Sequence, residues 1–381
     1  MNLVHCIVDD KFIDGMIDVF DTFTKDQVHH YIYLNDNITY KFRYIKKSDR
    51  ISIVRYSSFI GFLDQHKVNA ILLHSISSIR LSILPIVDKK IKIVWLAWGY
   101  DIYTYPTFGH PLVKIKNYYK PKTLKLIRDF SSWKIKMKQE VYYYFHLRGL
   151  KKAIHRIDYF SGVLPIEYSF LTRCSFFKAE QVFFNYTSLN NRICEENIND
   201  PIVKGNNILI GNSADPSNNH LDVFEKLSDI NTSGMQLYVP LSYGGNARYI
   251  TVVKNQGKEH FNHSFIPLED FLPLEEYSRI VSSCSNIIMY HERQQAMGNI
   301  FMALWNGCKV FLSETSVTYK YLKSCGYHVF SLDRDKNLLS ESTMFGTDSI
   351  MENRKIMIGD VSLQCQIRKI KRLLEKIKND A

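Results

Sequence analysis

Short apolar segments alternate twice with amphipathic stretches of helical spacing along this chain, and this alternation limits the fold more than any other feature. The first half contains runs such as NLVHCIVD, AILLHS and KIVWLAWG, and the second half contains NNILIGNS, NIIMYH and KVFLSE. Each run has the length of a strand and is bounded by polar or turn residues. Continuous apolar strands separated by helices indicate a parallel sheet that is covered on both faces. The sequence therefore predicts an α/β protein with two doubly wound domains.

The expected domain boundaries follow from length and composition. A chain of 381 residues exceeds the about 250–300 residues that one hydrophobic core organises. The polar stretch 193–207 lacks strand character and contains Pro201 and Gly205, so we expect a hinge there. We place a first domain at residues 1–195 and a second at 205–360. Residues 361–381 then form a basic amphipathic helix, with one face made by Ile367, Ile370, Leu374 and Ile377.

Cysteine use and hydropathy indicate the compartment. The seven cysteines are scattered without a CxxC pair, which is typical of buried thiols in a reducing compartment and argues against a disulfide framework or zinc site. The most apolar long window, residues 70–87, contains His74, Arg80 and several serines, so it is a poor membrane span. The start MNLVHCIVDD carries acids where an export signal carries Lys or Arg. We expect a soluble or membrane-peripheral protein of the cytoplasm.

The positive charge is concentrated in one segment. The chain has 49 Lys and Arg against 38 Asp and Glu, a net charge of +11, and residues 110–156 account for this whole excess. Bulky apolar groups alternate with the basic ones there, as an anionic membrane surface requires, and Lys134, Lys136 and Lys138 are the candidate membrane residues. The same basic and apolar residues would also suit the binding of single-stranded nucleic acid. The third alternative is an ordinary amphipathic helix pair with a solvated basic face. We favour the membrane surface over nucleic acid.

Five polar residues, HERQQ at 291–295, stand between two segments that are both predicted to be buried. Ligands of doubly wound sheets bind at the carboxyl ends of the strands, where this loop lies. Backbone donors at the start of the next helix attract phosphate, and Arg293 adds a charged fork. In the alternative interpretation, Glu292 and Arg293 merely pair with each other. The loop predicts a site for an anionic, hydroxylated ligand, with the candidates Glu292, Arg293, Gln294, Gln295, Gly298 and Asn299.

Two further strand ends in the second half carry polar loops that contain glycine. GNSADPSNNH follows the apolar run 208–210 and has the composition of a phosphate cradle. In LSYGGNARYI, Gly244 permits positive φ and Tyr243 is placed to stack on a base. Together the three loops predict a nucleotide-diphosphate site in the second domain. The remaining donor-binding candidates are Gly211, Asn212, Ser213, Asp215, Ser217, Asn218, Asn219 and His220.

The segments ILIGNSADPSNNHLDVF, LYVPLSYGGNARYI, RQQAMGNIFMAL and KIVWLAWGYDIY resemble the TDP-N-acetylfucosamine:lipid II N-acetylfucosaminyltransferase family, also called 4-alpha-L-fucosyltransferases and glycosyltransferase family 56. The resemblance extends from the WLAWGYD stretch to Asp333. It implies a GT-B glycosyltransferase that uses a nucleotide-sugar donor and a polyprenyl-diphosphate-linked saccharide acceptor in cell-surface polysaccharide assembly. It also implies work at the cytoplasmic face of the inner membrane as a peripheral protein, without a cofactor or a metal ion.

The first domain is then expected to supply the acceptor site. In a GT-B fold the two domains face a central cleft, and Trp98, Gly99 and Asp101 follow a strand whose carboxyl end would face it. Asp101 is a candidate general base for the acceptor hydroxyl, and its alternative role is to cap the strand end. His74 is a further acceptor-binding candidate, although a histidine there is more often structural. On the donor side, Glu292 would hold sugar hydroxyls and Arg293 would neutralise the leaving diphosphate.

The sequence also contains one pattern typical of metal sites and is compatible with one other class of function. Asp333 and Asp335 form a DxD pattern, but two acids at this spacing arise readily by chance and GT-B enzymes usually need no chelated metal ion. We therefore predict no metal site. The competing function is a non-catalytic basic protein that binds nucleic acid or anionic membranes. It gives no reason for three polar loops in a charge-neutral domain, so the glycosyltransferase interpretation is preferred.

Overall fold

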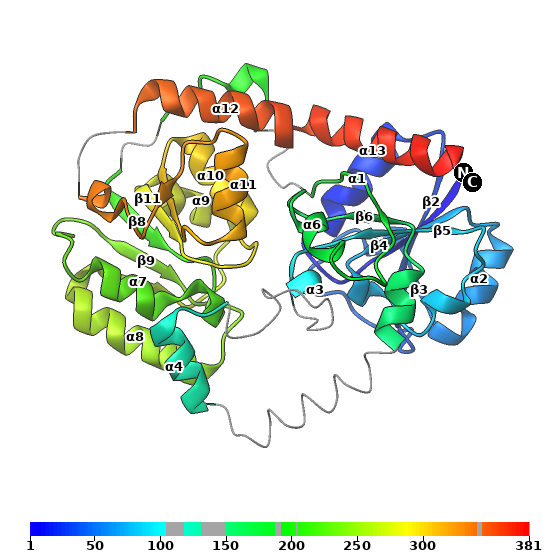
Figure 1. Cartoon of the computed structure of the whole chain (residues 1–381), viewed down its shortest axis with the longest axis horizontal. Coiled ribbons are helices and arrows are strands. Elements are labelled where there is room, and N and C mark those ends of the chain that lie inside the picture. Colours follow the sequence, from blue (N-terminus) through cyan, green and yellow to red (C-terminus); the bar gives the residue numbers. More distant parts are fainter. Residues whose placement is uncertain (104–117, 131–148, 187–191, 203–204, 341–344, 381) are drawn as a thin grey trace. The chain divides into compact units, whose positions relative to one another are not determined.

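The computed structural model describes residues 1–103, 118–130, 149–186, 192–202, 205–340 and 345–380 (Figure 1). The chain divides into two compact units. The first unit comprises Met1–Val113, Trp133–Ser188 and Leu363–Ala381, and the second comprises Lys114–Ser132 and Leu189–Ser362. Among the described residues, no helix combines the length and apolar character that crossing a bilayer requires.

The first unit is built on a parallel sheet with the strand order β3-β2-β1-β4-β5-β6-β7. Its strands are β1 (Asn2–Cys6), β2 (Val28–Leu34), β3 (Ile51–Val54), β4 (Ala70–His74), β5 (Lys92–Leu96), β6 (Tyr159–Ser161) and β7 (Glu180–Gln181). The α-helices whose bounds are described are α1 (Ile13–Phe23), α2 (Phe59–Gln65), α3 (Tyr100–Tyr103), α6 (Glu167–Leu171) and α13 (Leu363–Asn379). Short 3₁₀ turns lie at Ser48–Arg50, Tyr56–Ser58, Ile76–Ser78 and Leu84–Ile86.

The chain ends on the first unit through α13. The buried residues Ile370, Leu374 and Ile377 of this helix join the same hydrophobic core as Phe20 of α1 and Leu3 of β1. These apolar residues recur at helical spacing on one face of α13, so burying that face against the sheet is what holds the helix. The separate terminal helix predicted at residues 361–381 is α13, which begins at Leu363 and belongs to the first unit (Figure 1), whereas Val361 and Ser362 stay with the second unit.

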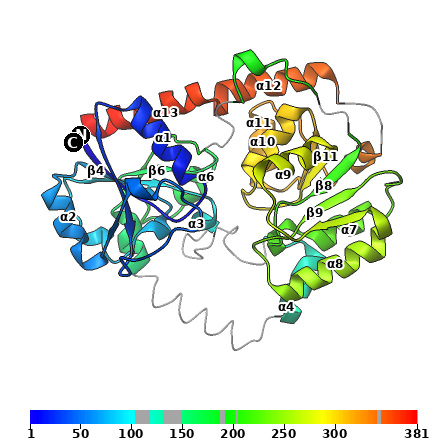
Figure 2. The same cartoon turned by 180° about the vertical axis from the view of Figure 1, so that it is seen from behind.

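The second unit has a parallel sheet with the strand order β10-β9-β8-β11-β12-β13. Its strands are β8 (Asn207–Ile210), β9 (Leu237–Pro240), β10 (Phe265–Leu268), β11 (Cys284–Met289), β12 (Lys309–Leu312) and β13 (Phe330–Ser331). Its α-helices are α4 (Pro121–Phe130), α7 (His220–Leu227), α8 (Ala247–Phe261), α9 (Leu274–Ser282), α10 (Met297–Asn306), α11 (Val317–Ser324) and α12 (Thr347–Val361) (Figure 2). Short 3₁₀ turns lie at Glu195–Asn197, Pro216–Asn218, Asn262–Ser264 and Lys336–Leu339.

Helix α4 belongs to the second unit although it precedes most of that unit in sequence. Ile127 and Phe130 pack against the core of the second sheet. At the start of α4, Asp222 of α7 accepts hydrogen bonds from the backbone N–H groups of Lys122 at 2.9 Å and Thr123 at 3.0 Å. A carboxylate at a helix N-terminus satisfies donors that the helix leaves free and complements its dipole. The boundary predicted at residue 195 therefore has to be corrected for this segment, and these two apolar groups are bound by protein rather than lipid.

The two doubly wound domains predicted from the sequence are confirmed. Every strand pair in either sheet is parallel. In both sheets the order of the strands reverses beside the first strand, between β1 and β4 in one sheet and between β8 and β11 in the other. Such a reversal leaves a crevice at the carboxyl ends of the two strands, where doubly wound proteins bind ligands.

Candidate functional site

Three polar loops of the second unit meet at the carboxyl ends of β8, β9 and β11. The loops after β8 and β11 flank the point where the strand order reverses. Gln295, from the loop after β11, donates through Nε2 to Asn212 Oδ1 at 2.9 Å. Asn212 in turn donates through Nδ2 to the hydroxyl of Tyr243, from the loop after β9, at 3.2 Å. The structure thus brings together the three loops that the sequence predicts to form one site.

The loop after β8 is shaped by its own side chains. Gly211 has φ +72°, and a Cβ at this position would lie 2.7 Å from Asn218 Oδ1. Only glycine fits this combination of left-handed backbone and close approach. Asn218 Oδ1 accepts a bond from the Asn212 N–H at 2.9 Å, and Asn218 Nδ2 donates to the Ser213 carbonyl at 3.0 Å. Asp215 accepts from the Ser217 N–H at 2.8 Å, so the turn is closed at both ends.

Two side chains tie this loop to neighbouring segments. His291 donates through Nε2 to Asn218 Oδ1 at 2.7 Å, and both residues are buried. Asn219 is in the left-handed region at φ 56°. Its Oδ1 accepts from the Lys120 N–H at 2.8 Å, and its Nδ2 donates to the Tyr290 carbonyl at 2.9 Å. Asn219 therefore joins the segment before α4 to the end of β11.

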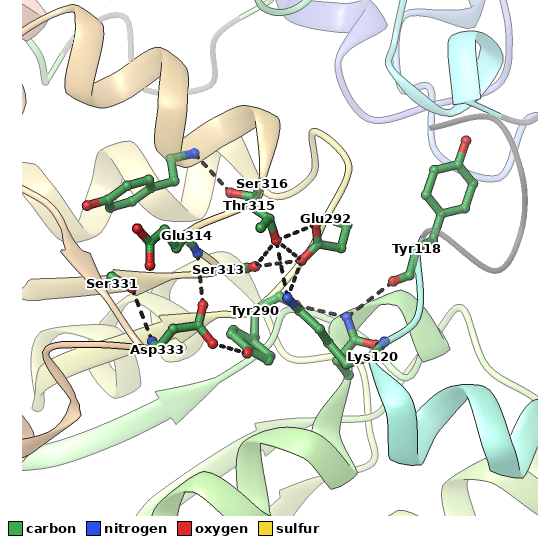
Figure 3. A network of polar contacts seen from close by, with 12 residues as sticks. Tyr118, Lys120, Tyr290, Glu292, Ser313, Glu314, Thr315, Ser316, Ser331 and Asp333 are labelled. Carbon is green, nitrogen blue, oxygen red and sulfur yellow. Dashed lines mark hydrogen bonds and ion pairs between the residues drawn. The ribbon is translucent and has the colours of Figure 1, made fainter. Parts of the chain in front are cut away.

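Glu292 is held by a cation and two hydroxyl groups (Figure 3). Its Oε1 lies 2.6 Å from Lys120 Nζ and accepts a hydrogen bond from Ser313 Oγ at 2.5 Å. Among the described residues, its Oε2 accepts one hydrogen bond, from Thr315 Oγ1 at 2.9 Å. The side chain of Glu292 is only 10% exposed, so solvent screens this ion pair weakly. The interpretation in which Glu292 pairs with Arg293 is therefore wrong, because Lys120 takes that place.

Arg293 keeps most of its hydrogen-bonding capacity. Within the described residues, its guanidinium makes one hydrogen bond, from Nη1 to the Gln294 carbonyl at 3.2 Å. The cation is close enough to Tyr119 and His291 to influence both. Burial raises the pKa of Tyr119 to about 12, which Arg293 opposes, while burial and then Arg293 lower the pKa of His291 well below its usual value. Among the residues that the structure describes, the other four N–H groups of Arg293 have no hydrogen-bond partner, so they can bind an anion.

His220 points an unused nitrogen at the same turn. It is fully buried at the start of α7, and its Nδ1 lies 3.1 Å from the Tyr249 hydroxyl. Its Nε2 has no hydrogen-bond partner among the residues that the structure describes, and a Cβ on Gly211 would lie 3.0 Å from it. Burial lowers the pKa of His220 to about 3, so the ring is neutral at ordinary pH. A buried polar atom without a partner is costly unless a ligand satisfies it.

The remaining candidates of the second unit lie around these loops. Tyr243 is 47% exposed, and Gly244 has φ +86°. Gln294 is buried, whereas Gly298 is exposed on the first turn of α10. Asn299 donates to the Tyr277 hydroxyl at 3.1 Å. Tyr243 and Gly298 are thus accessible to a ligand, and Asn299 supports α9 and α10.

In the first unit, Asp101 holds the loop after β5. It is 1% exposed, and its oxygens accept from the N–H of Trp98 at 2.9 Å, the N–H of Ile76 at 3.0 Å and the indole of Trp95 at 2.9 Å. Burial raises the pKa of this carboxyl group, which the three donors oppose. Gly99 turns the same loop with φ +81°. Both carboxylate oxygens are therefore engaged by protein donors.

The other first-half candidates differ in accessibility. Trp98 is partly buried, whereas His74 is fully buried and bonded to His5, with His74 Nε2 2.9 Å from His5 Nδ1. The membrane candidates Lys134, Lys136 and Lys138 lie outside the described residues.

The two aspartates of the DxD pattern are engaged by protein partners. Asp333 lies 3.1 Å from Lys226 Nζ, is hydrogen bonded to the Tyr290 hydroxyl and accepts from the Glu314 N–H at 3.0 Å. Asp335 accepts from the Ser331 N–H at 2.8 Å. Within the described ranges, no group of three or more His, Cys, Asp or Glu side chains is placed to hold a metal ion.

Sequence reasoning missed two residues of this site, Lys120 and Asp222. Lys120 stands in the basic segment, where nothing in its spacing separates it from the lysines around it. Asp222 is one acid among several polar residues of a helix. Their roles depend on the packing of α4 against α7, and no local sequence pattern predicts that packing.

Comparison with known sequences matches residues 126–339 to a family described as 4-alpha-L-fucosyltransferase, glycosyl transferase group 56. The match covers more than half of the chain. The chain belongs to the glycosyl transferase group 56 family. The family predicted from the sequence motifs is thereby confirmed, and so is the prediction that this protein is a glycosyltransferase.

Solved structures with the same fold extend over the whole length of this group 56 chain. Sucrose-phosphate synthase from Thermosynechococcus elongatus has 9% identity and a TM-score of 0.66, and all of both chains is covered. Anabaena HepE in complex with UDP and glucose has 8% identity and a TM-score of 0.64, covering 98% of this chain and 99% of HepE. An alpha-glucosyltransferase in complex with UDP has 10% identity and a TM-score of 0.53, covering 99% of both chains. At these identities the likeness concerns the fold, which is of the predicted GT-B type.

Proposed function

We propose that this group 56 protein moves a deoxy sugar such as N-acetylfucosamine from a nucleotide diphosphate to a polyprenyl-diphosphate-linked saccharide in cell-surface polysaccharide assembly. The family description names fucosyl transfer, and the related folds of HepE and the alpha-glucosyltransferase bind UDP. One observation carries the donor half of this proposal. The Arg293 guanidinium, most of whose donors have no partner among the described residues, acts on His291, and His291 is bonded to Asn218 in the loop that holds Gly211 against the unpartnered Nε2 of His220.

The diphosphate of the donor would sit at the carboxyl ends of β8 and β11. Gly211 lets a phosphate approach the backbone closely, and His220 Nε2 lies behind that turn, where the Nε2–H tautomer of this neutral ring would donate to a phosphate oxygen. Arg293 supplies the positive charge that stabilises the diphosphate as it leaves. Tyr243, which is half exposed, offers its ring to the nucleotide base. This division of roles requires no metal ion, and we propose that none is used.

Glu292 would bind the donor sugar. Its Oε1 is occupied by Lys120 and Ser313, whereas Oε2 contacts only Thr315 among the described residues. A carboxylate oxygen accepts about two hydrogen bonds, so Oε2 retains capacity for a sugar hydroxyl. Lys120 fixes the direction of the carboxylate. Glu292 thus acts as an oriented acceptor rather than as a mobile base.

The acceptor would bind at the first sheet, beside Trp98 and the turn at Gly99. We assign Asp101 to positioning this loop, because its carboxylate already accepts three hydrogen bonds and is closed to solvent. A polyprenyl-linked acceptor stays in the bilayer, so the protein has to approach the membrane. We propose that the basic segment including Lys134, Lys136 and Lys138 binds the anionic cytoplasmic face of the inner membrane.

A nucleotide-protection experiment tests the donor site. Melting temperatures are measured with dTDP, UDP, GDP and a single-stranded oligonucleotide, each at millimolar concentration. Binding to the folded state alone raises the melting temperature. We expect one nucleotide diphosphate to raise it and Arg293→Ala to abolish the rise. Stabilisation by the oligonucleotide, with none by any nucleotide diphosphate, would refute the enzyme and favour the nucleic-acid-binding alternative.

A further inference from the structure

A continuous hydrogen-bonded chain of three histidines crosses the first unit. His5 lies on β1, His29 on β2 and His74 at the end of β4. His5 Nε2 lies 3.0 Å from His29 Nδ1, and His5 Nδ1 lies 2.9 Å from His74 Nε2. His74 Nδ1 is hydrogen bonded to the hydroxyl of Tyr186. His5 and His74 are completely buried, so this polar chain runs through the core.

The direction of every bond in the chain follows from one residue at its end. The Thr24 hydroxyl donates to the Phe20 carbonyl at 2.6 Å, because a carbonyl can only accept. Thr24 Oγ1 lies 2.9 Å from His29 Nε2 and therefore accepts from it. The second neighbour of His29 Nε2 is the Thr24 carbonyl at 3.4 Å, which is also an acceptor. His29 thus carries its proton on Nε2 and accepts on Nδ1.

The proton positions of His5 and His74 follow in the same way. His5 must donate through Nε2 to His29 Nδ1, so its own Nδ1 accepts from His74 Nε2. His74 Nδ1 then accepts from the Tyr186 hydroxyl. All three imidazoles are neutral Nε2–H tautomers, and each ring nitrogen has a partner. A chain with a single direction and no broken link is the arrangement that conducts a proton.

The inner groups of the histidine chain, His5, His74 and Tyr186, stay neutral. Burial lowers the pKa of His5 well below its usual value and that of His74 to about 3, and burial raises the pKa of Tyr186. Each inner group therefore stays neutral when it acts alone. A concerted shift, in which every group gains one proton as it passes one on, moves a proton without charging the core. The hydrogen bonds already lie along that route.

The two ends of the chain differ from its middle. His29 is partly exposed, and burial lowers its pKa, as His30 does more weakly, whereas the Thr24 carbonyl, Asp21 and Asp26 raise it. These carboxylates favour a transient imidazolium that can release its proton to water. At the His29 end of the histidine chain, a proton can therefore pass to solvent.

At the other end, Tyr186 is partly buried and packs edge-on against Trp98, with ring centroids 5.2 Å apart. Its ionisable neighbours are Asp10, Tyr100 and Asp101. Trp98 follows β5, so this end lies where the first sheet is expected to bind the acceptor.

We propose that Tyr186 takes the proton of the acceptor hydroxyl and that His74, His5 and His29 carry a proton to solvent. This role rests on the proposed function, because it requires a hydroxyl acceptor at the first sheet. As the acceptor oxygen bonds to the anomeric carbon and the bond to the diphosphate breaks, the acceptor proton moves to Tyr186 oxygen. The Tyr186 proton moves to His74 Nδ1, that of His74 Nε2 to His5 Nδ1, and that of His5 Nε2 to His29 Nδ1. His29, which is partly exposed, turns its Nε2–H away from Thr24 and releases that proton to water, and the diphosphate leaves with the electron pair.

Kinetics of Tyr186→Phe and His29→Gln test this proposal, with dTDP-N-acetylfucosamine and a soluble polyprenyl-diphosphate saccharide analogue. Loss of a general base lowers turnover by about 100-fold or more, so we expect that loss in kcat for Tyr186→Phe, with the donor KM unchanged. In wild type, the rate in H2O–D2O mixtures should depend nonlinearly on the deuterium fraction, because several protons move together. The dependence should become linear in Tyr186→Phe. His29→Gln should shift the pH profile of kcat.

His66→Gln is the matched control, since His66 stacks on Phe62 outside the chain. Wild-type kcat in Tyr186→Phe would overturn the relay and leave the proposed function standing. A wild-type protein that transfers no sugar would refute both. ¹⁵N NMR of the histidine side chains provides a test without substrate. At neutral pH we expect His5, His29 and His74 as neutral Nε2–H tautomers, and any Nδ1–H form or imidazolium among them would overturn the relay.

Discussion

The ammonium group of Lys120 lies 2.6 Å from a carboxylate oxygen of Glu292, although the two residues come from distant parts of the sequence. Lys120 also contacts the ring of Tyr290, with Nζ 4.8 Å from its centroid. The pair joins the segment before α4 to the polar loop after β11. It sets the direction of the carboxylate that we assign to the donor sugar.

The first prediction concerns this pair. The side chains of Lys120 and Glu292 are 19% and 10% exposed, so Lys120→Met leaves a nearly buried carboxylate without its cation. Removing one partner of a buried pair costs about 3–5 kcal/mol of unfolding free energy. Lys122→Met is the matched control, because its partner Glu225 is exposed and such surface pairs contribute about 0–1 kcal/mol. Urea unfolding measures both variants, and equal losses would show that the Lys120 pair adds no stability.

The second prediction is that Arg293→Ala cripples transfer while the fold stays intact. A lost charge-assisted contact to a developing diphosphate costs about 3–4 kcal/mol of barrier, or roughly 100-fold or more in kcat. Arg279→Ala serves as the control, since Arg279 and its partner Glu275 are 74% and 86% exposed. Steady-state kinetics and thermal melting separate rate from stability. Near-wild-type turnover in Arg293→Ala would remove this residue from the site.

The third prediction is that transfer continues in excess EDTA. Asp333 is bonded to Lys226 and Tyr290, and Asp335 to a backbone N–H, so both carboxylates are engaged by protein donors. We expect full initial rates after chelation. Activity that disappears with EDTA and returns with Mg²⁺ or Mn²⁺ would make the DxD pattern a metal site after all.

The fourth prediction is a loss of stability in mild acid. Burial lowers the pKa of both His74 and His220 to about 3 in the folded state, against a usual value near 6.5. The unfolded chain then binds more protons below pH 6.5, so stability is complete above that pH and is lost as the pH falls toward 3. Each group contributes a slope of about 1.4 kcal/mol per pH unit. His220→Gln should remove one such slope in urea unfolding between pH 4 and 6, whereas replacing the exposed His260 should leave it unchanged.

The fifth prediction concerns the membrane. We expect wild-type protein to sediment with anionic liposomes, to be released by salt, and to ignore neutral liposomes, because exposed charges are screened. Reversing Lys134, Lys136 and Lys138 to Glu should abolish binding yet spare turnover of a soluble acceptor analogue. Undiminished liposome binding by this triple variant would make the segment an ordinary solvated face.

Local sequence patterns were sufficient for the sheets and for the loops of the donor site. Apolar runs of strand length and the polar residues that end them are encoded within a few neighbouring positions. The HERQQ and GNSADPSNNH loops were placed at one sheet edge on this basis alone, and the structure joins them through Asn218 and His291 at 2.7 Å. Parallel strands order their carboxyl ends together, so the pattern was informative before any contact was known.

Contacts between distant segments were decided only by the tertiary structure. Charge counting assigned the whole segment 110–156 to a membrane surface, yet α4 packs on the second sheet through Ile127 and Phe130. Composition cannot show which side of a helix faces protein. Asp222 accepts hydrogen bonds from the start of α4, and Glu292 forms an ion pair with Lys120. Both acidic residues lie far from α4 in the sequence.

The histidine chain shows the same division most clearly. Along the sequence, His5, His29 and His74 stand on three separate strands with nothing to link them. The order β2-β1-β4 places their strands side by side, and the register then aligns His5 with Leu72 of β4, two residues before His74. Strand propensity is a property of a few neighbouring residues, whereas strand order results from burying both faces of a whole sheet. The sequence alone therefore determined that these are buried strands, and only the folded sheet brought their imidazoles into one line.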